Sequence, residues 1–253
     1  YLQQIIDSGH AYVSKEEPNT ESILEGKSTR SEVIRFKNPN KVIKFNDLIR
    51  GEVSFDTTEL KDFVIAKSLT EPLYHMAVVI DDFEMGVTHV IRGEDHISNT
   101  PRHILIQDAI GANRPIYAHI PLILSTDRSK LSKRKGALSV TDYRDQGYLP
   151  ETIINYMAFL GWNPGTTQEL FSLKELVDAF DVSKIQKSGA TYNEEKLKWM
   201  NKQYLQKLSP EAFNAQALRF VPEKYLTEKN LETVHKIINI TRERISVMSE
   251  LKD

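Results

Sequence analysis

Residues 88–111 read THVIRGEDHISNTPRHILIQDAIG and join a short apolar strand to a helix. We expect the strand at residues 88–91. Thr100 is the expected N-cap of the helix, Pro101 stands at its first position and Gly111 ends it, and these residue types are typical of those positions. Strands and helices alternate along this part of the chain, which predicts an α/β fold.

The sequence before this stretch predicts a small antiparallel unit followed by a buried strand. Short strand-like runs lie at residues 33–36, 42–45 and 52–55. Residues 63–66 form an apolar run that is typical of a buried strand. Residues 74–80 are also apolar, but they fit a strand or a helix, so their type stays open.

The sequence after this stretch contains a basic loop and then helices. An apolar run at residues 116–124 leads directly into the loop, which would place the loop at the carboxyl end of a strand, where open α/β sheets bind ligands. The helical patterns lie at residues 151–160, 173–180, 194–208, 210–220 and from 231 onward. The second half is therefore expected to be an α-helical domain.

The composition is that of an ordinary soluble protein. Hydrophobic residues make up 40% and charged residues 27% of the 253 residues, and such a chain can bury a core. No apolar run approaches the roughly 20 residues of a membrane span, and the lack of cysteine fits a reducing compartment. We therefore expect a cytoplasmic protein that does not bind membranes. Because Tyr1 is not an initiator Met and no signal peptide follows it, we also expect an incomplete chain.

Positive charge is concentrated in one loop, although the net charge of −2 argues against indiscriminate nucleic-acid binding. Residues 125–136 contain five basic side chains and one acidic side chain, Asp127. Ammonium and guanidinium groups on a short loop suit a polyphosphate or an RNA backbone, and a solvated surface is the alternative. The sequence contains neither a Walker loop nor a Gly-x-Gly-x-x-Gly dinucleotide motif, so the P-loop and dehydrogenase interpretations have little support.

The centre of this loop, Lys130-Leu131-Ser132-Lys133-Arg134, resembles the lysine-serine-lysine signature of class I aminoacyl-tRNA synthetases in the form found in glutamyl enzymes. Further segments are similar to bacterial-type glutamyl-tRNA synthetases in order and spacing. They lie at residues 62–68, 74–82, 89–102, 119–122 and 147–150. The resemblance implies an α/β fold made of the second half of a class I synthetase Rossmann-type core, with a small α+β acceptor-binding insertion before it and an α-helical domain after it.

The resemblance also implies a ligase reaction in two steps. L-glutamate attacks the α-phosphate of Mg-ATP to give glutamyl-adenylate, and the glutamyl group then passes to the 3′ end of tRNA(Glu). Lys133, supported by Lys130 and Arg134, would stabilise the negative charge of the phosphoryl transition state, and Leu131 and Ser132 would complete the ATP-binding loop. The alternative for Lys133 is a solvated lysine. The expected partners are tRNA(Glu), L-glutamate and ATP, and a monomer is expected.

Four residues outside the loop match family positions at the substrates. Tyr74 and Arg92 are the expected glutamate contacts, because a guanidinium can bind a carboxylate through two hydrogen bonds. Asp95 and His96 are the expected contacts of the ATP ribose and adenine. Core packing is the alternative for Tyr74, an ion pair with Glu94 or Asp95 for Arg92, and a local hydrogen-bonding role for His96.

Two features of the family are missing from this sequence. The His-x-Gly-His signature, which grips ATP phosphates in the first half of the fold, does not occur among the seven histidines. About half of a typical family member is therefore present, and the chain alone is expected to be inactive. Many relatives carry a cysteine-rich zinc site, but this chain has no cysteine, so we expect no structural zinc and no other metal site.

The resemblance suggests four segments and leaves two alternatives to a glutamate–tRNA ligase. The segments are the rest of the acceptor-binding insertion (1–61), the second half of the Rossmann core (62–114), the ATP loop with a helical stem-contact domain (115–200) and the start of the anticodon-binding region (201–253). One alternative is glutamyl-queuosine tRNA synthetase, a shorter enzyme against which the helical extension argues. The other is a non-catalytic tRNA-binding remnant.

Overall fold

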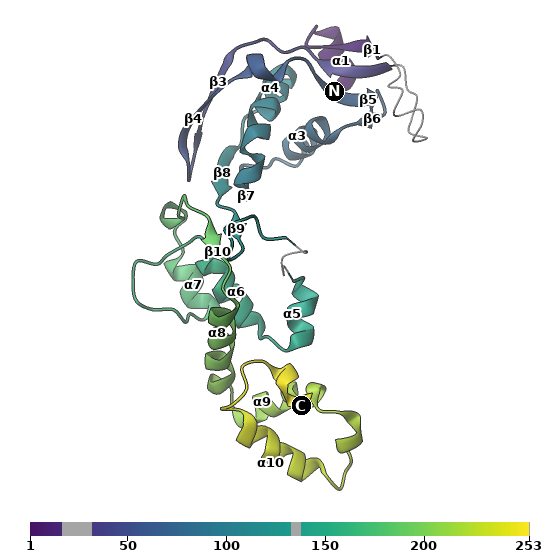
Figure 1. The fold of residues 1–253 in the computed structure, drawn as a ribbon. Coiled ribbons are helices and arrows are strands. Elements are labelled where there is room, and N and C mark those ends of the chain that lie inside the picture. Colours follow the sequence, from purple (N-terminus) through teal and green to yellow (C-terminus); the bar gives the residue numbers. More distant parts are fainter. Residues whose placement is uncertain (17–31, 133–137, 253) are drawn as a thin grey trace. The chain divides into compact units, whose positions relative to one another are not determined.

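The computed structural model describes residues 1–16, 32–132 and 138–252 of the chain (Figure 1). The chain folds as two compact units, Tyr1–Ile120 and Pro121–Asp253. Figure 1 colours the first unit from purple to teal and the second from teal to yellow. Each unit is described by itself.

The first unit contains two four-stranded sheets. One sheet is antiparallel, with the order β1-β2-β5-β6, and comprises β1 Ala11–Lys15, β2 Glu32–Phe36, β5 Phe63–Ser68 and β6 Glu71–Pro72. The other sheet is mixed, with the order β4-β3-β8-β7, and comprises β3 Val42–Asp47, β4 Gly51–Asp56, β7 His89–Gly93 and β8 Ile116–Ile120. In the mixed sheet β8 is parallel to both β3 and β7. The strands expected at residues 33–36, 42–45, 52–55, 63–66 and 88–91 are confirmed. The expectation that the first three form one antiparallel unit is wrong, because β2 pairs with β1 and β5 whereas β3 and β4 belong to the mixed sheet.

Helices cover these sheets and supply much of the core. They are α1 Leu2–Asp7, α3 Tyr74–Glu84 and α4 Thr100–Ile110, with the short 3-10 turns η1 Thr57–Leu60 and η2 Glu94–Asn99. The open assignment of residues 74–80 is resolved as a helix, in which Met76 and Val79 lie one turn apart and are both buried. Burying each such side chain contributes about 1.5–3 kcal/mol. These contacts fix α3 against the antiparallel sheet.

The start of α4 differs by one residue from the expectation. Thr100 is the first helical residue rather than the N-cap, and Asn99 occupies the cap position. The reason is that the hydroxyl group of Thr100 is used elsewhere, since it accepts a hydrogen bond from Arg92. The expected end of the helix is confirmed, because Gly111 adopts a left-handed conformation with φ of 73°.

The apolar run at residues 116–124 is not one strand, as expected, but two. Pro121 interrupts it, because proline has no N–H to continue a strand ladder. β8 ends before this proline, and β9 Ile123–Leu124 belongs to the second unit, where it pairs in parallel with β10 Ala190–Thr191. The basic loop therefore follows a two-residue strand of the second unit and not a strand of the mixed sheet.

The second unit is mainly helical, as expected. Its helices are α5 Val140–Gln146, α6 Pro150–Phe159, α7 Leu173–Ala179, α8 Glu194–Lys207, α9 Pro210–Ala217 and α10 Leu231–Thr241. Short 3-10 turns lie at η4 Val182–Lys184, η5 Leu218–Phe220, η6 Glu223–Tyr225 and η7 Met248–Lys252. Ser139 and Ser172 begin α5 and α7 with capping boxes, in which a serine and an acidic side chain satisfy the first backbone N–H groups. None of the helices in the described ranges is long and apolar enough to cross a membrane.

Candidate active site

Arg92 is the fourth residue of β7 and lies half-buried at the carboxyl end of this strand. Its Nε donates to Nε2 of His119 (3.2 Å), and its Nη2 donates to Oγ1 of Thr100 (2.9 Å). Longer contacts of 3.4 Å join Nη2 to the carbonyl oxygen of His96 and Nη1 to Nδ1 of His103. The guanidinium face lies over the ring of Tyr117, 5.9 Å from its centroid. Arg92 is therefore held by neutral groups.

The charge of Arg92 is not paired directly with an acid. In residues 1–16, 32–132 and 138–252, Arg92 forms no ion pair with a carboxylate. Glu94 pairs instead with Arg50, at 2.6 Å between Oε2 and Nη2. Asp95 is exposed and lies against Gly93. A Cβ atom added at position 93 would lie only 2.5 Å from Oδ1 of Asp95. The guanidinium is thus available to an anionic ligand, since a positive charge at a half-buried position gains from a negative partner.

Asp47 and His119 form a buried pair behind Arg92. Nδ1 of His119 lies 2.6 Å from Oδ2 of Asp47, and both side chains have an exposed fraction of 0%. The pKa of Asp47 is lowered overall: burial raises it, but hydrogen bonds from the Arg50 and Ile49 backbones and from His119 outweigh burial. Burial lowers the pKa of His119 below its ordinary value, and the nearby Arg92 lowers it further, against the opposing effect of Asp47. At neutral pH the pair is therefore a carboxylate and a neutral imidazole.

Tyr74 and Arg92, the two expected glutamate contacts, share His103 as a neighbour. The ring of Tyr74 lies 5.9 Å from that of His103, whose Nδ1 faces Arg92 and whose Nε2 lies 3.0 Å from Nδ1 of His75. Burial lowers the pKa of His103 to about 3, so its ring is neutral. Tyr74 begins α3 with half of its surface exposed, which argues against core packing as its main role. The first unit thus brings an exposed phenol and a guanidinium to the same neighbouring ring.

His96 lies in η2, half-buried, and contributes both its backbone and its ring. Its carbonyl oxygen accepts from Arg92, and its Nδ1 lies 3.2 Å from Nδ2 of Asn99. This contact is the local hydrogen bonding that the sequence left as an alternative. The ring also lies 6.3 Å from that of Tyr74, so His96 belongs to the surroundings of the same site.

The basic loop begins with a tight turn in the second unit. Asp127 closes the turn by accepting from the backbone N–H of Ser129 (2.9 Å), and Arg128 adopts a positive φ of 63°. The N–H of Leu131 donates to the carbonyl oxygen of Ile123 in β9 (2.9 Å), which ties the loop to the strand before it. The acidic residue of the loop therefore has a structural role. Lys130, Leu131 and Ser132 follow in the described chain, whereas Lys133 and Arg134 lie outside the described residues.

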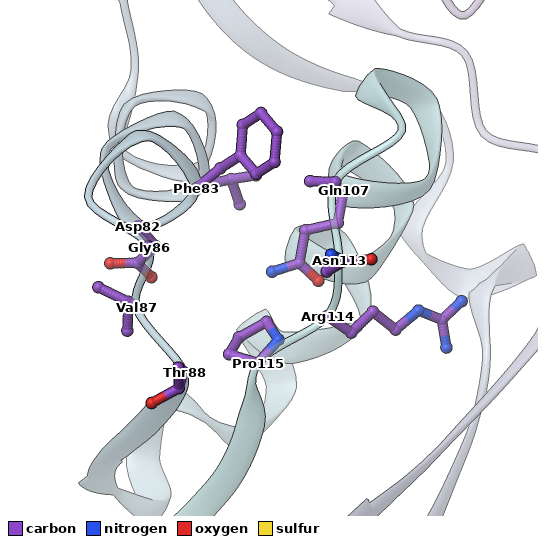
Figure 2. Close-up of a pocket in the computed structure, with 11 residues that line it drawn as sticks. Asp82, Phe83, Gly86, Val87, Thr88, Gln107, Asn113, Arg114 and Pro115 are labelled. Atoms are coloured by element: carbon purple, nitrogen blue, oxygen red, sulfur yellow. The ribbon is translucent and has the colours of Figure 1, made fainter.

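Cavities occur near the loop and at the amino ends of β7 and β8. The first, about 520 Å³, lies between the turn at Ser125 and the start of α8. The second, about 300 Å³, lies between the ends of α3 and α4 and contains none of the expected site residues (Figure 2). Figure 2 shows Asp82 and Val87 on one side of this cavity and Gln107 and Asn113 on the other. Within the described ranges, no group of three or more His, Asp or Glu side chains is arranged to hold a metal ion.

Sequence reasoning missed the side chains that hold Arg92. Asp47 continues the buried face of β3 after Ile43 and Phe45, so an acid in an apolar register was the signal that could have found it. Thr100 was assigned to helix capping, and His119 was named only within the segment 119–122 that resembles the family, without a role of its own. The second signal is the strand register, which makes Arg92 and His119 direct partners in the parallel pair of β7 and β8 and so places their side chains near each other.

A strand-end arginine in the first unit and a basic loop in the second suit a protein that binds anionic ligands such as nucleotides, and comparison with known families identifies the class. The family described as "tRNA synthetases class I (E and Q), catalytic domain" matches residues 18–199. The chain therefore belongs to the class I tRNA synthetases of the glutamate and glutamine group.

Within this family, the relatives are glutamate–tRNA ligases. The chain is 44% identical over 230 residues to the enzyme of Carboxydothermus hydrogenoformans, covering 88% of this chain and 48% of the relative. It is 41% identical over 283 residues to that of Aquifex aeolicus, covering 100% and 60%. A crystal structure of a glutamate tRNA ligase from Elizabethkingia meningosepticum in complex with its amino acid matches with a TM-score of 0.84 and 34% identity, over 99% of this chain and 60% of that one. The chain thus spans about half to three fifths of the length of these relatives.

Proposed function

We propose that the full-length protein carrying this chain is a glutamate–tRNA ligase. It activates L-glutamate with ATP to glutamyl-adenylate and transfers the glutamyl group to the 3′ end of tRNA(Glu). The observation that carries the proposal is Arg92, a guanidinium held at a strand end by neutral acceptors and without a carboxylate partner in the described chain. Glutamate carries two carboxylates, and the names of the relatives support this amino acid.

The substrate roles follow from the chemistry of each side chain. Arg92 binds a carboxylate of glutamate through paired hydrogen bonds, and the exposed hydroxyl group of Tyr74 donates to the same ligand. Asp95 accepts from the ATP ribose, and His96 packs against the adenine. These roles are supported by the position of the residues around one strand end and by the family to which the chain belongs.

The basic loop acts on the phosphates. Lys133 stabilises the charge that develops on the phosphoryl group, Lys130 and Arg134 assist it, and Leu131 and Ser132 shape the loop. Mg²⁺ enters with ATP as part of the substrate. The turn closed by Asp127 supports this role, because it anchors the start of the loop to β9.

The remaining expectations are part of the same proposal. The protein works in the cytoplasm as a monomer without structural zinc, and the chain alone is inactive. The chain comprises four segments. They are the rest of an acceptor-binding insertion (1–61), the second half of the Rossmann core (62–114), the ATP loop with stem-contact helices (115–200) and the start of the anticodon-binding region (201–253). The described helices that continue to residue 252 count against the shorter glutamyl-queuosine enzyme.

The test is glutamate-dependent exchange between ATP and pyrophosphate on the full-length protein with tRNA(Glu) present. We expect exchange in the unsubstituted protein and a loss of roughly a hundred- to a thousand-fold in Lys133→Ala, because that substitution removes a donor used in the transition state. Lys174→Ala, an exposed lysine of α7, is the control and should keep full activity. A well-folded protein without exchange would leave a non-catalytic tRNA-binding remnant as the better description.

A further inference from the structure

His119 can accept the Nε–H group of Arg92 only in one of its two neutral tautomers. A neutral imidazole carries its proton on one nitrogen and accepts on the other. Nε2 lies 3.2 Å from Nε of Arg92, which always donates, so Nε2 has to be the accepting nitrogen. Nδ1 then carries the proton, and it lies 2.6 Å from Oδ2 of Asp47, which only accepts. The distances on both sides of the ring therefore require the same tautomer.

Asp47 is itself fixed by the backbone around it. Its Oδ1 accepts from the N–H groups of Ile49 (3.0 Å), Arg50 (2.9 Å) and His119 (3.2 Å). These bonds use one carboxylate oxygen completely and aim the other at His119. Nε of Arg50 also donates to the carbonyl oxygen of His119 (3.1 Å), which holds the backbone of β8 against the turn after β3. The carboxylate cannot turn away without breaking several hydrogen bonds.

We propose that Asp47 and His119 are positioning residues for glutamate binding: Asp47 holds His119 in the Nδ1–H tautomer, and His119 thereby orients the guanidinium of Arg92 toward the substrate carboxylate. The inference rests on the proposed function, in which Arg92 binds glutamate. Thr100 completes the arrangement, because its Oγ1 receives the Nη2–H group of Arg92 while Nε2 of His119 receives Nε–H. The longer contacts of Nη2 with the carbonyl oxygen of His96 and of Nη1 with Nδ1 of His103 also hold the plane of the guanidinium. A substrate carboxylate would use the remaining Nη1–H group and replace one of these 3.4 Å contacts.

The pair also sets the charge at the site. Asp47 acts on Arg92 through the hydrogen bond to the imidazole ring and does not contact the guanidinium. A carboxylate in direct contact with Arg92 would compete with the substrate for the same donors, whereas this indirect arrangement leaves them available. Titratable groups around His119 are Asp47, Arg50 and Arg92, and together with burial their effects leave the imidazole neutral at pH 7.

Asp47→Asn separates this role from a purely structural one. The amide oxygen has to occupy the Oδ1 position, because three backbone N–H groups donate there. The amide NH₂ group then faces Nδ1 of His119, which is forced to accept, and the proton moves to Nε2, where it opposes the Nε–H group of Arg92. An aspartate-to-asparagine change acts in this way on the histidine of serine proteases. The shape of the core is kept, and only the direction of one hydrogen bond is reversed.

Two measurements on the full-length protein test the proposal. The first is the ¹⁵N spectrum of the histidine rings at pH 7, with His119 assigned from its loss in His119→Gln. We expect Nδ1–H in the unsubstituted protein and Nε2–H in Asp47→Asn. The second is the KM for glutamate in the exchange assay, which should rise by about 10- to 100-fold in Asp47→Asn while kcat changes much less, because Arg92 binds the ground state and the transition state alike.

The matched control is Asn38→Ala, which also removes a buried side-chain hydrogen bond in the first unit, from Nδ2 to the carbonyl oxygen of Thr57 (2.6 Å). Its KM should stay at the unsubstituted value. An Nε2–H tautomer or an imidazolium in the unsubstituted protein would overturn the proposal even if Asp47→Asn does not fold. A folded Asp47→Asn with unchanged KM would also overturn it. A protein without any glutamate-dependent exchange would contradict the proposed function instead, and the tautomer would still be measured.

Discussion

Charged residues at the two ends of the parallel strands β7 and β8 differ in their hydrogen-bond partners. At the carboxyl end, Arg92 is bound by neutral acceptors, one of which, His119, contacts Asp47. At the amino end, Asp82 lies half-buried beside a cavity of about 300 Å³ and has no hydrogen-bond or ion-pair partner within the described chain (Figure 2). Burial raises the pKa of Asp82 against the opposing effect of the Arg92 charge, whereas hydrogen bonds leave the pKa of Asp47 lowered. The hydrogen bonds around Asp47 outweigh the effect of its burial, whereas burial dominates at Asp82.

The largest expected effect compares the arginines at the two ends. Arg92→Ala should reduce kcat/KM for glutamate in the exchange assay by about a hundred- to a thousand-fold, because it removes a paired, charge-assisted contact with the substrate. Arg114→Ala removes an exposed guanidinium that pairs with Asp108 at the amino end, and it should leave kcat/KM nearly unchanged. Equal losses in both variants would show that the two ends are not functionally distinct.

Acid should affect the carboxyl end through His103. Burial lowers its pKa from 6.5 to about 3. Below pH 6.5 the imidazole of His103 is therefore protonated in the unfolded chain but stays neutral in the folded chain. As the pH falls from 7 to 5, the free energy of unfolding should therefore decrease, by at most about 2 kcal/mol for this one residue. His103→Gln should remove this part of the loss in urea unfolding.

The control for this pH effect is His89→Gln, which replaces an exposed histidine at the amino end of β7. Carboxylates titrate equally in both variants, so their contribution cancels in the comparison. If His103→Gln and His89→Gln lose the same stability between pH 7 and pH 5, the buried imidazole is not the source of the acid sensitivity.

A smaller effect is expected from the hydroxyl groups at the two ends. Thr100→Val keeps the shape of a fully buried side chain but removes the acceptor of the Nη2–H group of Arg92. The KM for glutamate should rise by about five- to tenfold, which corresponds to roughly 1 kcal/mol, the net contribution of a typical hydrogen bond. Thr88→Val, at the cavity on the amino side, should leave KM unchanged. A normal KM in Thr100→Val would mean that the remaining acceptors of Arg92 orient the guanidinium without Thr100.

The sequence predicted the elements of the fold better than the groups that complete the site. Alternating apolar residues and end signals such as Gly111 act over a few residues, so the strands and the end of α4 could be inferred directly. The basic loop was found from its charge, and similarity to a family then assigned it to ATP and Arg92 to glutamate. Asp47 lies 72 positions from His119 in the sequence, and no local pattern shows that two such residues meet. The break at Pro121 was missed because the apolar run continues across it.

The smallest expected effect is a gain in stability at the amino end. Because burial raises the pKa of Asp82 in the folded chain, its ionised form is destabilised at pH 7, and Asp82→Asn should increase the free energy of unfolding by about 0.5 kcal/mol or less. The gain should shrink as the pH falls through the pKa of the folded state, because the unsubstituted protein then takes up a proton and loses the same penalty.

Asp108→Asn provides the opposite sign at the same end of the strands. Asp108 pairs with both Lys41 and Arg114, so its substitution removes favourable contacts and should lower the free energy of unfolding at pH 7. Urea unfolding at pH 7 and pH 4.5 distinguishes the two cases. If Asp82→Asn also destabilises the protein at pH 7, the carboxylate of Asp82 takes part in a stabilising interaction, as that of Asp47 does. The contrast between the two ends would then rest on Arg92 alone, because both acidic groups would be stabilised by their surroundings.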